Sequence, residues 1–232
     1  MDVLKEENEL NSEKKTFFSE NDKIIFKVFL RFFLISTCLI FCVFTFWIHC
    51  RLTNSIPASE YSFTEILQEL LLFIDVVLFG IIAHKNKSLK ESAILAGCFT
   101  ACMFVRELDF LFDYVSNYLW KILVFAIVIA AFSLTFRKTG LKTTVSSLVN
   151  LTKADGFVEI FYGLLIVLII SRLMGMNIVW LFTDNINYDF YMHKRFVEET
   201  LELCGYCLYT IGVASILIKT SNESNNKAIN YL

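Results

Sequence analysis

Long apolar blocks dominate the chain and predict membrane-spanning helices. A helix needs about 20 apolar residues to cross a bilayer core of about 30 Å. Six blocks of this kind follow one another along the chain, separated by short polar connections: Val28–Ile48, Phe63–Ala83, Ala93–Val115, Tyr118–Phe136, Phe157–Trp180 and Val197–Ile218. We therefore expect an all-α, polytopic membrane helix bundle with six transmembrane helices, forming one domain over residues 24–219.

Polar segments flank this domain at both ends. Residues 1–23 mix lysines with acidic residues and are expected to form a solvated tail, and residues 220–232 form a second, shorter tail. The longest internal connection, residues 137–155, spaces Leu141 and Val145 at a helical interval beside basic residues. It is either a short interfacial helix or a plain loop.

The distribution of lysine and arginine predicts the orientation of the bundle, because loops on the cytoplasmic side are enriched in these residues. The connections after the second and fourth blocks and both tails are rich in basic residues, among them Lys85, Lys87, Lys90, Arg137, Lys138, Lys142 and Lys153. The opposite connections hold only Arg51, Lys194 and Arg195. We expect both termini to lie in the cytoplasm.

Composition supports a membrane protein and excludes several other classes. Of the 232 residues, 56% are hydrophobic and 19% are charged, against roughly 25% charged in a soluble domain. A disordered chain, a collagen-like repeat and a small disulfide scaffold are thereby excluded. The net charge of −2 gives no reason to expect a nucleic-acid partner. Abundant phenylalanine, isoleucine and lysine with a single proline suit an AT-rich bacterial genome, so we expect the bacterial inner (plasma) membrane.

Charged residues inside the predicted spans are the most informative feature. Each costs roughly 2.5–3.5 kcal/mol near the bilayer centre and usually faces the bundle interior. Most of them fall in the predicted outer half: the acids Glu65, Glu69, Glu107, Asp109, Asp113, Glu198, Glu199 and Glu202, and the bases Arg106 and Arg172. If the third block is one continuous helix, Arg106, Asp109 and Asp113 share a face and Glu107 points away from it. The pattern predicts a polar cavity open to the outside, although charges that pair with one another would give the same pattern.

Three classes of function are compatible with this cluster. The first is a non-catalytic accessory, sensor or assembly component, whose charges pair internally, with a membrane-protein partner or with a second copy. The second is an intramembrane, metal-assisted hydrolase or transferase acting on a lipid at the outer leaflet. In that enzyme Arg106 and Arg172 would bind an anionic group, and the candidate catalytic residues are Glu107, Asp109 and Glu202.

The metal expected for such an enzyme is a hard divalent cation, Mg²⁺, Mn²⁺ or Ca²⁺, because the available ligands are mainly carboxylates. The candidate ligands are Glu69, Glu107, Asp109, Asp113, His193, Glu198 and Glu202. No haem is expected, because His49, His84 and His193 all lie at the edges of the predicted spans.

The third class is a small cation- or proton-coupled transporter. Asp75 lies below the outer cluster, toward the inner half, and is the candidate for a proton path. The spans lack the Gly/Pro interruptions and the internal repeats that many transporters show. In all three classes the bilayer surrounds the protein, and the expected ligand is a lipid or a small ion.

Overall fold

A computed structural model of the chain describes residues 25–26, 28–44, 63–114, 116, 118–180 and 188–229. The backbone alone is described for residues 113, 137–139, 179–180, 188–193 and 223–229. The chain divides into two units, Met1–Phe41 and Cys42–Leu232. In the first unit the described residues form an apolar helix, Val28–Phe44, which ends in the second unit. The predicted tail 1–23 and the last four residues of the first block, 45–48, lie outside the described residues.

The structure is 92% helical, and the described residues form no strand, which confirms the all-α class. The elements of the second unit are α2 (Phe63–Lys85), α3 (Lys90–Glu107), α4 (Asp109–Asp113), α5 (Leu119–Thr152), α6 (Phe157–Leu165), the π-helix η1 (Ile166–Ile170), α7 (Ser171–Gly175), the 3₁₀-helix η2 (Asn177–Trp180) and α8 (Tyr188–Ile229).

Four helical segments in the described part of the chain are long and apolar enough to cross a membrane: Phe63–Lys85, Leu119–Phe136, Phe157–Gly175 and Lys194–Asn222. Helix α3 matches the third predicted block, but its two ends carry the charged residues Lys90, Glu91, Arg106 and Glu107. The chain is therefore an integral membrane protein by the length and composition of its helices. The count of six spans and the orientation of the termini remain predictions.

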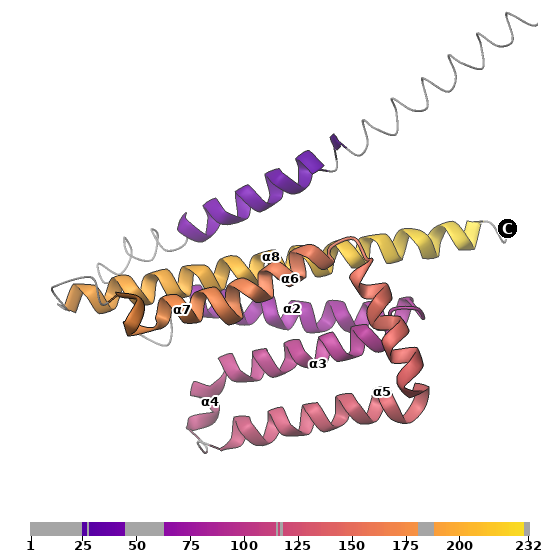
Figure 1. The fold of residues 1–232 in the computed structure, drawn as a ribbon, viewed down its shortest axis with the longest axis horizontal. Coiled ribbons are helices and arrows are strands. Elements are labelled where there is room, and N and C mark those ends of the chain that lie inside the picture. Colours follow the sequence, from indigo (N-terminus) through magenta and orange to yellow (C-terminus); the bar gives the residue numbers. More distant parts are fainter. Residues whose placement is uncertain are drawn as a thin grey trace, which may run out of the picture. The chain divides into compact units, whose positions relative to one another are not determined.

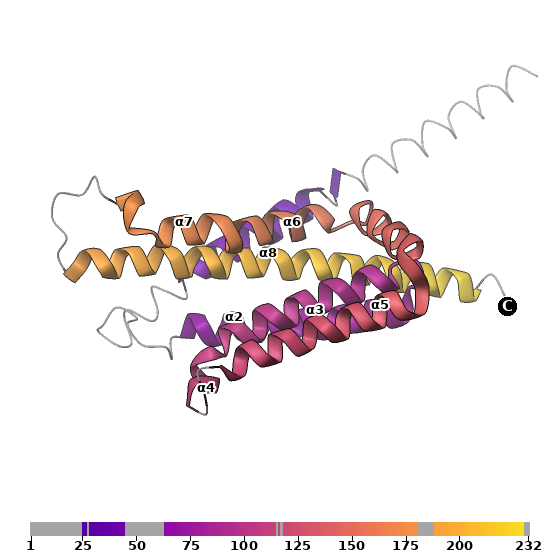
Figure 2. The same cartoon turned by 60° about the horizontal axis from the view of Figure 1, so that its bottom comes forward.

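Successive long helices of the second unit run in alternating directions (Figure 1). Helix α3 packs between α2 and α5, and α8 packs between α2 and the α6–η1–α7 segment. Figure 2 shows the same row of helices from another side. Because the directions alternate, the α2–α3 turn lies at one end of the unit, whereas α4 and the beginning of α8 lie at the other.

Two helices break or continue at positions where the predicted blocks do not. The third block is interrupted at Leu108, which ends α3 before the short helix α4 begins. Helix α5 runs past the predicted end of the fourth block and bends at Gly140, where φ is 76°. This left-handed conformation favours glycine because glycine has no Cβ. Residues 141–152 are helical, so the plain-loop alternative is wrong for this stretch, and the interfacial position of the helix stays a prediction.

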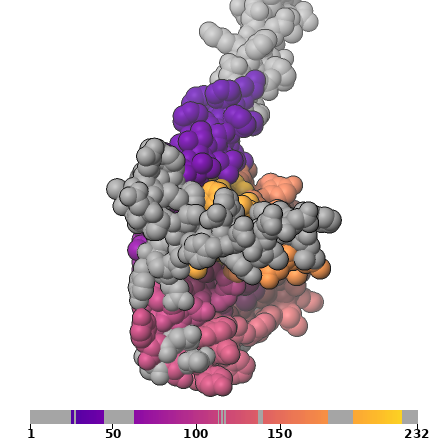
Figure 3. All heavy atoms as spheres, turned by 90° about the vertical axis from the view of Figure 1, so that its left-hand side faces the viewer, coloured from indigo at the N-terminus to yellow at the C-terminus, as the bar shows by residue number. Residues whose placement is uncertain are grey.

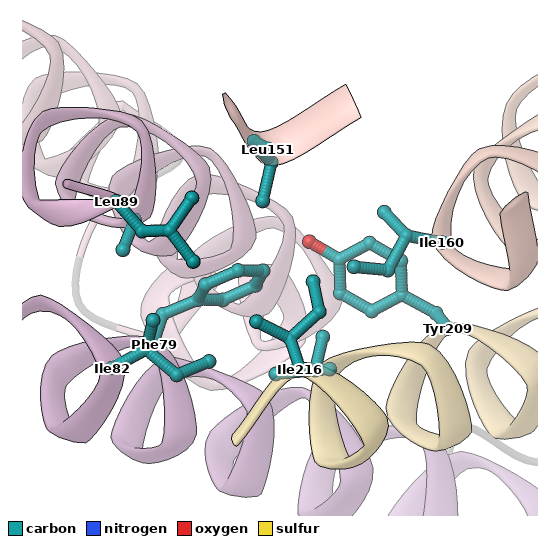
Figure 4. Close-up of a cluster of buried hydrophobic side chains, with 9 residues drawn as sticks. Phe79, Ile82, Leu89, Leu151, Ile160, Tyr209 and Ile216 are labelled. Carbon is teal, nitrogen blue, oxygen red and sulfur yellow. The ribbon is translucent and has the colours of Figure 1, made fainter. Parts of the chain in front are cut away.

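Two buried apolar clusters stack along the interior. The larger contains Phe79, Tyr209 and Ile216, with Leu89 from the α2–α3 turn and Leu151 from α5 (Figure 4). The rings of Phe79 and Tyr209 are tilted, with centroids 6.2 Å apart. The second cluster lies nearer the beginning of α8 and consists of Leu72, Met103, Val167 and Tyr206.

Glycines allow α6 and α8 to approach closely. Gly163 faces Gly205, and Gly156 faces Gly212. A Cβ on Gly163 would lie 2.7 Å from the carbonyl oxygen of Gly205, which is closer than real side chains come. The two pairs have the same seven-residue spacing on both helices, so they form one continuous seam. Such small-residue seams bring helix backbones into van der Waals contact inside a membrane.

Candidate functional site

The charged residues predicted to share the outer half meet at one end of the second unit. This is the end where α3 passes into α4 and where α8 begins (Figure 1). Figure 3 looks onto it, with the surface of α4 and α5 in pink and that of the α6–α7 region in orange. The alternating helix directions place the first turns of α2 and α8 beside the last turns of α3 and α7. Charged side chains at this end form three groups of ion pairs, two of which join residues far apart in the sequence.

The first group joins α7 to α8 through Arg172. Its guanidinium lies 2.8 Å from the Glu202 carboxylate and 3.2 Å from the Glu198 carboxylate. The hydroxyl of Ser171 lies 3.4 Å from the same Glu202 oxygen, but its proton is donated to the Val167 carbonyl oxygen over 2.6 Å. Glu202 is only 6% exposed, so Arg172 supplies the main polar contact that water would otherwise give it. One arginine thus balances two carboxylates one turn apart on α8.

The second group joins α2 to α8 through Arg195. This arginine donates to Glu199 over 2.6 Å and to Glu65 over 3.1 Å. Beside it, the buried amide of Gln68 donates to the backbone carbonyl oxygen of Glu199 over 3.2 Å. These contacts tie the first turns of α2 to the first turns of the membrane-spanning part of α8.

The third group joins α3 to α8. Arg106 donates to its neighbour Glu107 over 2.9 Å, and the hydroxyl of Tyr206 donates to the same carboxylate oxygen over 2.8 Å. Arg106 and Glu107 are adjacent residues of α3, and their long side chains meet although they leave the helix in different directions. The third block is not one continuous helix, because α3 ends at Glu107 and α4 starts at Asp109. The break at Leu108 also removes the single helical face assigned to Arg106, Asp109 and Asp113.

Two cavities adjoin these groups. The first, of about 130 Å³, is acidic and is lined by Glu65, Gln68, Glu69, Glu107, Asp109 and Phe110. Glu65 and Glu107 already accept hydrogen bonds from arginines. Glu69, one turn along α2 from Glu65, has no ion-pair partner among the residues that the structure describes.

The second cavity, of about 250 Å³, is larger and mostly apolar. Helices α3, α5, η1, α7 and α8 all contribute to its wall. Both predicted anion-binding residues, Arg106 and Arg172, line it, as do Glu107 and Tyr206. The structure thus brings the two arginines to a single cavity, although each also has a carboxylate partner within the bundle.

Asp75, the candidate for a proton path, lies apart from both cavities. Its side chain is 0% exposed. One carboxylate oxygen accepts a hydrogen bond from the hydroxyl of Thr210 over 2.8 Å, and the other has no partner in the described part of the chain. Leu72 and Phe79, one turn before and after it on α2, belong to the two buried apolar clusters.

The predicted metal ligands do not gather as one set. Glu69, Glu107 and Asp109 line the acidic cavity, whereas Glu198 and Glu202 pair with Arg172. The side chains of Asp113 and His193 lie outside the described residues. Among the described side chains, no three of His, Cys, Asp or Glu are arranged to hold a metal ion.

Sequence reasoning missed several residues that shape this end of the protein. Tyr206, which donates to Glu107, follows Glu202 by four positions, and this spacing predicts that the two share a face of α8, although Tyr206 was not among the predicted site residues. Trp120, which lines the larger cavity from α5, gave no comparable signal. Neither did the π-helix η1, whose extra residue per turn leaves no recognisable sequence pattern.

No family description, no curated protein and no solved structure matches the chain.

Proposed function

We propose that the chain is a non-catalytic, multi-pass component of a bacterial inner membrane, of the accessory, sensor or assembly kind, with both termini in the cytoplasm. The observation that carries this proposal is the internal pairing of the charges at one end of the bundle. Arg106, Arg172 and Arg195 each contact a carboxylate of the same bundle, at distances of 2.6 to 3.2 Å.

Ion pairs of this kind stabilise the packing of the helices. A charge in a low-dielectric interior is tolerated when a partner of opposite sign and further hydrogen bonds compensate it. Here every arginine of the cluster has that compensation, and two of them, Arg172 and Arg195, connect different helical segments. The charges therefore fix which helices are neighbours and how they are rotated against one another.

The enzyme alternative assigns catalytic roles to the same side chains. Of its candidate catalytic carboxylates, Glu107 accepts hydrogen bonds from Arg106 and Tyr206, and Glu202 contacts Arg172 and Ser171. Carboxylates held in this way are occupied as structural acceptors. The transporter alternative depends on Asp75, which lies between apolar residues with Thr210 as its polar contact. These contacts favour the structural function over both alternatives.

A double-mutant cycle on the α2–α8 pair tests the proposal. In purified, detergent-solubilised protein, Glu65→Gln should lower the free energy of unfolding by about 0.5–1 kcal/mol, and by clearly less when Arg195 is already replaced by Gln. Glu69→Gln is the matched control: it removes a carboxylate one turn away that has no ion-pair partner in the described structure, and it should leave stability unchanged or raised. Equal losses for Glu65→Gln in both backgrounds would contradict internal pairing.

Metal content separates this function from the enzyme alternative. Elemental mass spectrometry on the purified protein should find no stoichiometric Mg²⁺, Mn²⁺ or Ca²⁺. Stoichiometric metal that a Glu107→Gln/Asp109→Asn variant loses while remaining folded would instead favour a metal-assisted enzyme. In that case, turnover of outer-leaflet lipids would be the next measurement.

A further inference from the structure

The larger cavity combines two arginines with a mostly apolar lining. Arg106 comes from α3 and Arg172 from α7. Trp120 and Val124 of α5 and Leu168 of η1 contribute apolar surface. A lining of this composition suits a ligand that has an ionic group joined to a hydrocarbon chain.

Helices α5 and η1 bound the cavity without packing against each other. Among the described elements, α5 packs on α3, on α4 and, through its far end, on α6, but not on η1 or α7. Leu168 of η1 and Phe99 of α3, both on the cavity wall, are exposed on the surface of the protein. In a bilayer these side chains contact lipid, so the gap between α5 and η1 gives access to the cavity from the membrane.

Both arginines retain donors for a further partner. A guanidinium carries five N–H donors, and the ion pairs use one nitrogen of Arg106 and two nitrogens of Arg172. Their side chains are 43% and 42% exposed. The acidic residue of the cavity wall, Glu107, already accepts from Arg106 and Tyr206. The lining itself therefore holds two cations and one anion, whereas Glu198 and Glu202, which contact Arg172, lie outside it. An anionic group in the cavity would meet the guanidinium N–H groups directly.

The charged and aromatic residues of the lining lie near the ends of their helices. Arg106 lies one residue from the end of α3, Arg172 three residues from the end of α7, and Trp120 is the second residue of α5. At 1.5 Å per residue, all three are within about 5 Å of these helix ends. Tryptophan is enriched at the boundary between headgroups and acyl chains, and arginine near a helix end can extend its guanidinium toward that boundary.

We propose that this cavity binds an anionic phospholipid from the adjacent leaflet. The phosphate contacts the guanidinium groups of Arg106 and Arg172, and the first part of one acyl chain lies between α5 and η1. The cavity volume of about 250 Å³ is below the roughly 300–1,000 Å³ of pockets that enclose drug-sized ligands. The site therefore holds the headgroup region, while the remainder of the lipid stays in the bilayer.

Trp120 provides a native reporter for this lipid. The full chain carrying Trp47→Phe and Trp180→Phe retains Trp120 as its single tryptophan, and it is reconstituted with phospholipids brominated on the acyl chain. We expect brominated phosphatidylglycerol to quench Trp120 with an apparent affinity at least about fivefold above that of brominated phosphatidylcholine. Equal quenching by the two lipids would mean that Trp120 meets only ordinary boundary lipid, which would overturn the proposal.

Variants assign the preference to the cavity. Arg106→Gln should reduce the ratio of the affinities for brominated phosphatidylglycerol and phosphatidylcholine toward one. Lys194→Gln removes a cation at the same end but outside the cavity wall, and it should leave this ratio unchanged. Val124→Phe enlarges an apolar side chain of the lining without touching any ion pair and should weaken quenching by the anionic lipid. It also keeps the test decisive if Arg106→Gln does not fold. A preference that survives in Val124→Phe, or that Lys194→Gln removes equally, would refute the site.

Inorganic phosphate separates the lipid from a free anion. If the acyl chain contributes to binding, phosphate at millimolar concentration should leave quenching by brominated phosphatidylglycerol nearly unchanged. Full displacement by phosphate would show that the cavity takes the soluble anion, and the assignment to a lipid would then be wrong.

Discussion

Replacing Arg172 by glutamine tests the ion pair that joins α7 to α8. The change removes the guanidinium that contacts Glu198 and Glu202 at 3.2 and 2.8 Å. Glutamine keeps a similar length but no charge, so the two carboxylates are left one helical turn apart without a cation between them. Like charges at this spacing repel each other, and Glu202 has little access to water to compensate the loss.

The exposure of the two partners sets the expected magnitude. Removing one partner of a buried ion pair costs about 3–5 kcal/mol, whereas an exposed pair contributes about 0–1 kcal/mol. The Arg172 side chain is 42% exposed and the Glu202 side chain 8% exposed, so this pair lies between the two limits. We expect Arg172→Gln to lower the free energy of unfolding by about 2 kcal/mol.

Unfolding by SDS in mixed micelles, followed by circular dichroism, measures this change. Arg172→Gln/Glu202→Gln should recover part of the loss, because the second substitution removes the unpaired carboxylate. Lys142→Gln, at an exposed lysine of the 141–152 helix, is the control for loss of a positive charge and should stay within about 0.5 kcal/mol of the unmodified protein. An Arg172→Gln protein of unchanged stability, or a double variant no more stable than the single one, would refute the reasoning.

Three further predictions concern packing, the buried carboxyl group and topology. Gly163→Leu forces atoms into the Gly205 backbone and should destabilise the α6–α8 contact by about 1–3 kcal/mol or more. Gly80→Ala is the control, because its Cβ meets nothing within 4 Å, and it should not destabilise the protein. Equal melting temperatures for the two variants would contradict the close approach of α6 and α8. Asp75→Val removes a buried carboxylate with one unpartnered oxygen and should leave the free energy of unfolding unchanged or raise it by about 1 kcal/mol, so a clear loss in the same SDS titration would assign Asp75 a stabilising role. In a chain whose native cysteines are replaced by serine, Ser116→Cys should react with a membrane-impermeant maleimide on intact cells and Ser88→Cys only after permeabilisation; the reverse pattern would invert the predicted orientation.

The class of fold and the level of the charges in the bundle could be predicted from the sequence. Apolar blocks determine where helices form, and the rise of 1.5 Å per residue determines how deep each side chain lies. Because successive helices alternate in direction, Arg106 near the end of one span and Glu202 near the start of another were expected at one level. In the structure, Tyr206 of α8 contacts Glu107 beside Arg106, and Arg172 of α7 contacts Glu202.

Local backbone breaks escaped the prediction because apolar periodicity continues across them. Leu108 continues the apolar pattern between charged neighbours, yet the helix ends there, and Arg106 pairs with the adjacent Glu107. The π-helix at Ile166–Ile170 is made of residues that suit an α-helix equally well. It changes the rotation of every residue that follows, including Arg172, so the orientation of that side chain could not be calculated from an ideal helix.

The sequence by itself therefore determined that this chain forms membrane-spanning helices with charges concentrated toward one end. Only the tertiary structure decided which arginine pairs with which carboxylate and that Arg106 and Arg172 share a cavity with Trp120. The physical reason is that depth along a helix depends on position within one segment. Helix neighbours and rotation depend on packing between segments far apart in the chain, such as Gly163 against Gly205, and no local period encodes that packing.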